Sequence, residues 1–272
     1  MISVLQLGTL AYANGIQIQQ RLVELRKEGR IDDVLLLLEH TPVITLGRNA
    51  KQTNIVASPE LLARRGVEVF ECDRGGDVTF HGPGQLVGYP IFDLRARPSS
   101  EGGRKTMGAI EYVRKLEEVL IRGCADFGIP AKRICGLTGV WTDSDNSGRC
   151  VTAPEAGSRP EGKLAAIGVH ISRSVTSHGF ALNVNTDLSY FDLIVPCGIT
   201  DKRVTSMRQE LGREISMAEV AESVSRNFGF VFDSQMLWVQ SLEDLIPPPT
   251  DFPLQVPKSL RKLHGEEETF RA

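Results

Sequence analysis

Cys197 has the surroundings in this chain that most favour covalent chemistry, because it lies between a proline and a glycine. The segment Pro196-Cys197-Gly198 follows an apolar run and predicts an irregular, constrained backbone, unlike the helix and strand interiors where cysteine is a small buried filler. A thiol attacks as its thiolate, and a nearby cation lowers the pKa of the thiol. The other four cysteines are widely spaced and form no Cys-x-x-Cys pair, so neither a disulfide framework nor a zinc site is indicated.

Lys163 is the candidate cation, at the start of the apolar segment 163–171. A lysine in this position can turn inward, or it can remain a solvated charge at the end of a strand, and the residues alone leave both readings open. If Lys163 turns inward beside Cys197, the two groups can share one proton as thiolate and ammonium. Only the fold can bring these distant residues together.

Two glycine-containing segments could bind a ligand. Five glycines and a proline surround Arg74 and His81 in the segment 74–88, and glycine lets the backbone approach a ligand closely. The spacing is neither that of a P-loop nor that of a dinucleotide-binding turn. The segment therefore predicts either a ligand-binding backbone or a tight hairpin with structural glycines. In the second segment, His178 and Gly179 precede an alternating stretch, where the histidine can also be purely structural.

The elements that must position these residues alternate between helices and short strands. Apolar spacing predicts helices over 11–27, 109–127 and 217–228, and a short helix that begins at Ser58-Pro59. Strands are predicted over 34–40, 42–47, 67–70, 89–94, 139–142, 163–171 and 180–185. The strands 139–142 and 163–171 are expected to pair across a polar excursion. This mixture predicts an α/β or α+β domain with a mixed, largely antiparallel sheet flanked by helices.

Composition limits the classes of function. The 272 residues are 41% hydrophobic and 24% charged, which is ordinary for a globular domain, and the net charge of -3 gives no basic field for nucleic acid. The sequence has neither a transmembrane run nor a signal peptide, so a cytoplasmic location is expected. We expect a catalytic domain over 1–238 with a mobile excursion at 143–162. Residues 239–272 are expected to form a disordered or loosely packed C-terminal extension.

Three separate blocks together resemble the lipoyl(octanoyl) transferases. The blocks are Arg74 to Ile91, Lys163 to Gly168, and His178 to Leu188 with Pro196 to Ile199 and Val204 to Met207. They occur in the family's order, and the resemblance covers roughly residues 5–230. It implies a fold like the catalytic domain of biotin and lipoate protein ligases. Three blocks are far more specific than one glycine-rich loop.

The resemblance also implies a reaction and its partners. The family moves an octanoyl group from octanoyl-acyl carrier protein to a lysine of a lipoyl domain, the first step in making protein-bound lipoate. The expected acceptors are lipoyl domains of 2-oxoacid dehydrogenase E2 subunits and the glycine cleavage H protein. The resemblance implies no cofactor, no metal, no nucleic acid and no membrane partner.

Carried over residue by residue, the resemblance assigns the acyl-thioester cysteine to Cys197 and the lysine that lowers its pKa to Lys163. The implied substrate-binding residues are Arg74, Gly75, Gly76, Asp77, Val78, Thr79, Phe80, His81, Ala166, Ile167, Gly168, Gly179, Phe180 and Ala181. The glycines among them are expected to leave room for an acyl chain. The oxyanion donors stay open between the His81–Gly84 turn and the amides of Cys197 and Gly198.

The sequence departs from the family pattern in the long excursion at 143–162, in a tail after Trp238 without a recognised counterpart, and in Phe80, where the family often has tyrosine. Lys132, Arg133, Lys202 and Arg203 are either a docking rim for acidic partners or simply solvated charges. Two rival functions remain. An ATP-dependent ligase on the same fold would not need Cys197, and a non-catalytic acyl- or lipoyl-domain-binding protein would carry no acyl group on it.

Overall fold

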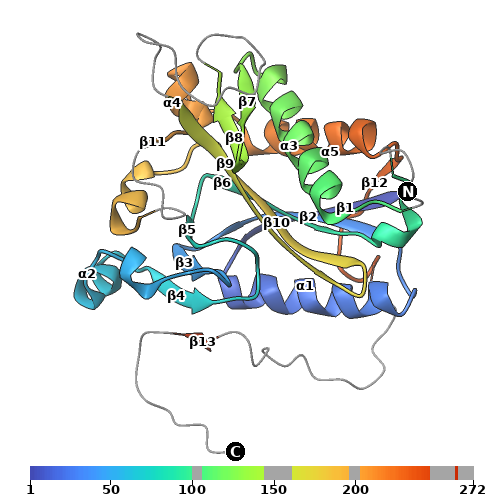
Figure 1. Cartoon of the computed structure of the whole chain (residues 1–272), viewed down its shortest axis with the longest axis horizontal. Helices are drawn as coiled ribbons and strands as arrows, with labels where there is room; N and C mark the ends of the chain where they lie inside the picture. Colours follow the sequence, from blue (N-terminus) through green and yellow to red (C-terminus); the bar gives the residue numbers. More distant parts are fainter. Residues whose placement is uncertain (100–105, 144–160, 196–202, 246–260, 263–272) are drawn as a thin grey trace, which may run out of the picture.

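The computed structural model describes residues 1–99, 106–143, 161–195, 203–245 and 261–262. Its strands form two sheets (Figure 1). The large sheet has the order β12-β1-β2-β6-β10-β9-β8-β7, with β11 paired to β9, and the small sheet has the order β13-β4-β3-β5. The strands are β1 Ile2–Leu10, β2 Asp33–His40, β3 Val43–Leu46, β4 Glu68–Glu71, β5 Val78–His81, β6 Gln85–Ile91, β7 Ala131–Ile134, β8 Leu137–Thr142, β9 Gly162–Ser172, β10 Val175–Asn183, β11 Arg203–Val204, β12 Met236–Trp238 and β13 Arg261–Lys262.

Most neighbouring strands are antiparallel, while β1 runs parallel to β2 and to β12, β3 to β4, and β11 to β9. The predicted mixed, largely antiparallel sheet is therefore confirmed. The helices are α1 Tyr12–Lys27, α2 Pro59–Arg64, α3 Ala109–Asp126, α4 Met207–Leu211 and α5 Met217–Val231, with short 3-10 turns η1 Gln52–Asn54, η2 Leu94–Ala96 and η3 Leu188–Leu193. The predicted pairing of 139–142 with 163–171 is confirmed as the antiparallel pair β8–β9.

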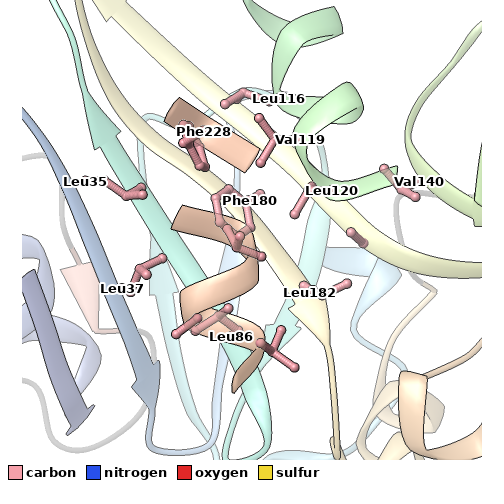
Figure 2. Close-up of a cluster of buried hydrophobic side chains, with 14 of the residues drawn as sticks. Leu35, Leu37, Leu86, Leu116, Val119, Leu120, Val140, Phe180, Leu182 and Phe228 are labelled. Atoms are coloured by element: carbon pink, nitrogen blue, oxygen red, sulfur yellow. The ribbon is translucent and has the colours of Figure 1, made fainter. Parts of the chain in front are cut away.

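Helices cover both faces of the large sheet. On one face, α3 and α5 bury a core that includes Leu35, Leu37 and Phe180 (Figure 2). On the other face, α1 packs against Leu36 and Leu38. The continuous apolar run of β2 is thus buried on both sides, as its composition predicts.

Local chemistry sets several helix boundaries. The hydroxyl of Ser58 accepts a hydrogen bond from the amide of Leu61 and so caps α2, as predicted. Gly128, with φ +76°, follows the last turn of α3 in the left-handed conformation that favours glycine. Among the described residues, no helix combines the length and apolar composition that crossing a bilayer requires.

The glycine-dense segment does not form a simple hairpin. Its first strand, β5, pairs with β3 of the small sheet, whereas its second strand, β6, pairs with β2 and β10 of the large sheet. The turn at Gly82–Gly84 therefore carries the chain from one sheet to the other. The predicted strand at 89–94 is wrong at its start, because pairing with β10 begins at Gln85.

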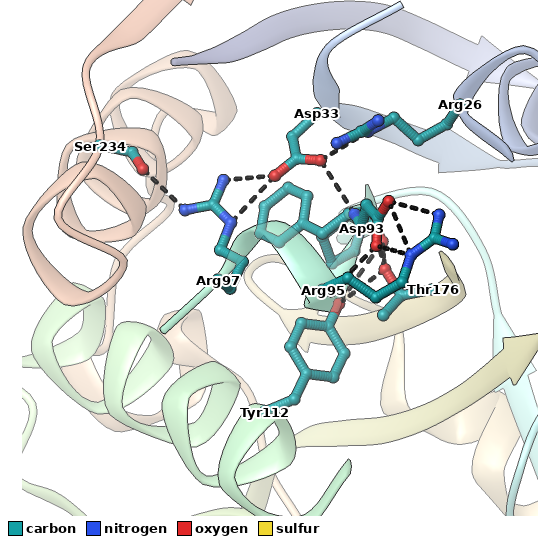
Figure 3. A network of polar contacts seen from close by, with 10 residues as sticks. Arg26, Asp33, Asp93, Arg95, Arg97, Tyr112, Thr176 and Ser234 are labelled. Atoms are coloured by element: carbon teal, nitrogen blue, oxygen red, sulfur yellow. Dashed lines mark hydrogen bonds and ion pairs between the residues drawn. The ribbon is translucent and has the colours of Figure 1, made fainter. Parts of the chain in front are cut away.

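A buried polar network fastens the start of β2 (Figure 3). The carboxylate of Asp33 accepts hydrogen bonds from the guanidinium groups of Arg26 and Arg97 and from the amide of Asp93. Arg97 also donates to the hydroxyl of Ser234, which follows α5. The network joins helix ends and loops from both faces of the sheet. A buried carboxylate needs such paired donors.

The segment after β12 continues along the sheet. The amide of Val239 donates to the carbonyl of Val4, and Val239, Leu242 and Leu245 pack against the core beside α1. The boundary between a catalytic domain and an extension at 238/239 stays a prediction, since most of 239–272 lies outside the described residues. Residues 144–160 of the excursion also lie outside them.

Candidate active site

A pocket lies between the two sheets and gathers the three sequence blocks. The pocket is lined by Tyr12, Arg74, Gly75, Gly76, Asp77, Thr79, His81, Val87, Tyr89, Ala166, Ile167, Gly168, His178, Gly179, Phe180 and Ala181. Twelve of the fourteen residues predicted to bind substrate are among them. Their role in binding stays a prediction, but their convergence is a property of the fold.

Strand register arranges the floor of the pocket in rows. Ala181 of β10 lies opposite Ala166 of β9 and Val87 of β6, and directly opposed residues share a face of the sheet. One row further along, Gly179 lies opposite Gly168. The floor is therefore built from small residues of three adjacent strands.

Alternation along β5 separates the predicted residues into two sets. Thr79 and His81 line the pocket, while Val78 and Phe80 are buried in a third apolar cluster, separate from the two on the faces of the large sheet. In this cluster the ring of Phe80 stacks on Tyr190, with the ring centroids 4.7 Å apart. The two-residue period of a strand explains this division, which places Val78 and Phe80 away from the pocket.

Phe180 and Ile167 border the pocket from strands whose other face meets the main core. The Phe180 ring is buried there and stacks against Phe228, and Ile167 packs against the same core. Their neighbours Ala181 and Gly168 belong to the pocket face. Phe180 thus holds β10 against the helices rather than presenting its ring to a ligand.

The pocket glycines allow close backbone approach rather than open space. A Cβ added to Gly168 would lie 2.6 Å from the carbonyl oxygen of Gly75, and one added to Gly179 would collide with the carbonyl oxygen of Gly88. The amide of Gly75 donates to the carbonyl of Val169 at 3.0 Å. The expectation that these two glycines make room for an acyl chain is corrected: they let the 74–77 loop and the strands meet.

Arg74 holds this loop from within. Its buried guanidinium donates to the carbonyl and hydroxyl of Thr45, to the carbonyl of Asp77 at 2.7 Å, and to the carbonyl of Gly75 at 3.0 Å. All these acceptors are uncharged. Arg74 therefore fixes the loop and leaves a positive charge beside the pocket.

His81 has a defined tautomer because its neighbour is fixed. The side-chain amide of Gln85 donates to Asn183 and to the carbonyl of Phe80, so its oxygen faces His81 Nδ1 at 2.8 Å and accepts from it. Burial lowers the pKa of His81 well below its usual value. The ring is therefore neutral, with Nε2 as an acceptor 3.4 Å from the hydroxyl of Thr45.

His178 lies inside β10, not before it as predicted. Its φ of +55° is left-handed, and its Nε2 lies 2.7 Å from the carboxylate of Asp73. This hydrogen bond lowers the pKa of Asp73 to about 2. Burial outweighs the attraction of Asp73 and lowers the pKa of His178. The pair is therefore a neutral imidazole that donates to a carboxylate.

A β-bulge brings Lys163 to the pocket face. Val140 and Trp141 are adjacent on β8, but they oppose Ala165 and Lys163 on β9, so Leu164 is an extra residue on that strand. With strict alternation, Lys163 and Ala166 would point to opposite faces. Instead both line a small void that shares Thr79, Ala166 and Ala181 with the pocket. Lys163 is thus buried at one end of the pocket, which confirms the inward orientation.

Cys197 lies outside the described residues, so its contact with Lys163 stays a prediction. The described chain on either side is close to the Lys163 end. Phe191 and Val204 line the same void as Lys163, and Val204 opposes Lys163 in the β11–β9 pair. The amide of Thr205 donates to the carbonyl of Lys163 at 3.0 Å.

The suggested docking rim is not supported. Lys132 is buried between the carboxylates of Asp143 and Glu161, at 3.1 and 3.2 Å. Arg133 pairs with Glu117 and Glu118, and Arg203 pairs with Glu210. These three cations are engaged within the chain, and Lys202 lies outside the described residues.

Sequence reasoning missed Tyr12, Val87 and Tyr89 as pocket residues and treated His178 as a strand-end histidine. Val87 and Tyr89 follow from the alternation of β6 once its first residue is known. Tyr12 reaches the pocket from the first turn of α1, and no local signal indicates that contact.

The chain resembles known proteins in sequence and in fold. A model of the family "Lipoyl protein ligase A/B catalytic domain" matches residues 11–229. An octanoyltransferase of Koribacter versatilis is 60% identical over 267 residues, covering 98% of both chains. An octanoyltransferase of Acidobacterium capsulatum is 56% identical and covers 91% of this chain and 96% of the relative. The first match includes most residues after Trp238, so the tail does have a counterpart.

Solved structures show the same fold at low identity. A bi-partite lipoate protein ligase of Thermoplasma acidophilum has a TM-score of 0.62 at 16% identity, with 89% of this chain and 87% of that chain covered. A lipoate-protein ligase A bound with ATP has a TM-score of 0.62 at 14% identity, with 89% of each chain covered. The family match and the two relatives lead to one conclusion. The chain belongs to the octanoyltransferases of the lipoyl protein ligase A/B catalytic-domain family, and so to the acyltransferases.

Proposed function

We propose that this acyltransferase moves an octanoyl group from octanoyl-acyl carrier protein to a lysine of a lipoyl domain, through a thioester on Cys197. The observation that carries the proposal is the single pocket that three sequence blocks line and that Lys163 closes at one end. The acceptors are lipoyl domains of 2-oxoacid dehydrogenase E2 subunits and the glycine cleavage H protein. Residues 1–238 form the catalytic domain.

In the first step, the thiolate of Cys197 attacks the carbonyl carbon of the octanoyl thioester. A tetrahedral oxyanion forms and collapses, the bond to the carrier's sulfur breaks, and the carrier's thiolate leaves with a proton from the Lys163 ammonium, which becomes a neutral amine. One thioester replaces another, so the exchange is nearly balanced and needs no ATP. The Lys163 ammonium supports the attacking thiolate.

In the second step, the amine of the acceptor lysine attacks the Cys197 thioester. An amide bond forms, the bond to the Cys197 sulfur breaks, and the thiolate is restored. The attacking nitrogen loses a proton, and Lys163 is the base that accepts it. Amide formation from a thioester is downhill, so this step makes the transfer effectively one-way.

The pocket suits an acyl chain because its described floor is apolar. Val87, Ala166 and Ala181 form one row, and the rings of Tyr12 and Tyr89 lie further from Lys163. Each buried CH₂ group contributes about 0.8 kcal/mol, so an eight-carbon chain gains several kcal/mol from this surface. The reacting carbonyl is then held at the Lys163 end.

Intact-protein mass spectrometry with octanoyl-acyl carrier protein tests the thioester. We expect an octanoyl adduct on the wild type and none on Cys197→Ala. The matched control is Cys124→Ala, since Cys124 lies on the buried face of α3 and burial raises the pKa of its thiol to about 12. This variant should be acylated like the wild type.

The same assay separates the rivals. Full transfer by Cys197→Ser, or a requirement for ATP and free octanoate, would replace this mechanism with that of a ligase. A wild type that binds octanoyl-acyl carrier protein but gains no mass would indicate a binding protein.

A further inference from the structure

Three side chains form a row across β7, β8 and β9. Trp141 of β8 lies opposite Lys132 on β7 and opposite Lys163 on β9. Directly opposed residues of antiparallel strands point to the same face. The indole therefore lies between two lysines, next to the end of the pocket where Lys163 is found.

We propose that Trp141 is a positioning residue that holds the Lys163 ammonium at the active site without neutralising it, a role that rests on the proposed function of Lys163. The ammonium nitrogen lies 5.2 Å from the centroid of the Trp141 ring. Trp141 is 1% exposed and Lys163 is 9% exposed, so the contact is largely shielded from water. Cation–π attraction is strongest for tryptophan and in desolvated sites.

The stem of Lys163 is held from the other side as well. Gly139 has a φ of +130°, and a Cβ placed there would lie 3.0 Å from Lys163 Cε and 2.6 Å from the carbonyl oxygen of Ala165. Glycine at this position leaves a path just wide enough for the lysine stem. Gly139 and Trp141 together fix where the ammonium ends, which reduces its freedom before substrate arrives.

An aromatic ring and a carboxylate differ in the net charge that remains when each contacts a lysine. A carboxylate cancels the charge of a lysine, and the pair then exerts little field on a third group. The indole attracts the ammonium through its quadrupole and carries no net charge. Contact with the Trp141 ring therefore does not itself cancel the positive charge of Lys163.

The indole of Trp141 also lowers the stability of the protein in a way that a phenylalanine ring would not. Its indole N–H is buried, and it has no hydrogen-bond acceptor in the described part of the chain. A buried unsatisfied donor reduces stability. A residue chosen only to fill this position would not need that group, whereas the stronger attraction of the indole face for a cation accounts for its presence.

The experiment compares Trp141→Leu and Trp141→Phe with the wild type. The readouts are kcat and KM for octanoyl transfer, and the pH dependence of iodoacetamide alkylation of Cys197. For Trp141→Leu we expect kcat to fall about tenfold with little change in KM, and alkylation to need a higher pH. Trp141→Phe should lie between the two, with a melting temperature near that of the wild type.

Two controls separate positioning from a structural role. Trp238→Leu, at the half-exposed tryptophan of β12, should change neither readout. In a Lys163→Ala background, Trp141→Leu should have no further effect, because Trp141 acts through that lysine. A wild-type alkylation profile in Trp141→Leu, or an equal loss in both backgrounds, would overturn the proposal. An absence of octanoyl on wild-type Cys197 would instead overturn the proposed function, and the alkylation cycle would still report on Trp141.

Discussion

Lys132 and Lys163 lie on either side of Trp141, and both are buried, yet their surroundings differ. The ammonium of Lys132 lies between the carboxylates of Asp143 and Glu161, whereas that of Lys163 lies over the Trp141 ring. The first arrangement joins β7 to the two ends of the 143–162 excursion. In the second arrangement, the ring that contacts the ammonium carries no net charge. Two buried lysines on the same face of one sheet thus differ in the groups that their ammonium nitrogens contact.

His40 shows a third way to bury a basic group. Its Nε2 accepts from the hydroxyl of Tyr89 at 2.7 Å, and its Nδ1 donates to the carbonyl of Leu10 at 3.1 Å. Burial lowers the pKa of His40 to about 4, so the ring is neutral at pH 7. The molecule therefore neutralises one buried base with carboxylates, holds a second on an aromatic ring and leaves a third uncharged.

The largest expected effect is the loss of transfer activity in Lys163→Met. Methionine keeps much of the buried stem and removes the charge, so the rate of Cys197 acylation should fall by about 10²–10⁴-fold. The free energy of unfolding, measured in urea, should change little. A Lys163→Met protein that acylates at the wild-type rate would show that the pocket lysine is structural.

Lys132→Met is the matched substitution on the other side of Trp141. It leaves the buried carboxylates of Asp143 and Glu161 without their cation, so the free energy of unfolding should fall by about 3–5 kcal/mol. The activity of each folded molecule should remain close to that of the wild type. A Lys132→Met protein that loses activity at unchanged stability would contradict the structural role expected for Lys132.

The smallest effect concerns His40 and pH. The unfolded histidine takes up a proton near pH 6.5, but the folded one resists protonation down to about pH 4. The unfolded state therefore binds more protons in this range, and stability falls as the pH drops from 6.5 toward 4, by roughly 3 kcal/mol in all.

Urea unfolding of wild type and His40→Gln at pH 7.5 and pH 4.5 measures this contribution. The difference between the two pH values should be smaller in the variant. The pH dependence of stability that remains in His40→Gln comes partly from His81 and His178, whose pKa values burial also lowers. An equal pH dependence in both proteins would mean that His40 titrates normally in the folded state.

Elements set by local chemistry could be predicted from the sequence. The apolar run of β2, the cap at Ser58 and the glycine after α3 each act within a few residues, and each is found. The start of β6 was missed because Gln85 to Gly88 resembles a loop by composition. Gly88 is needed there because the Phe180 ring occupies the space where a Cβ would be, and that contact comes from a distant strand.

The candidate site divides in the same way. The blocks that line the pocket could be identified by their resemblance to the family. The orientation of Val78 away from the pocket follows from the alternation of β5 alone. The faces of Lys163 and Trp141 depend on the register between β8 and β9, which local sequence does not determine. Their contact therefore became visible only in the structure.

The bulge at Leu164 has a consequence for comparing family members. Residues before and after it follow opposite parities along β9, so the orientation of Lys163 depends on the bulge as well as on residue identity. A relative with the same number of residues here but without the bulge would still align a lysine at the same column. The side chain of that lysine would point into the helix-covered core, so an aligned motif does not by itself place the ammonium at the pocket.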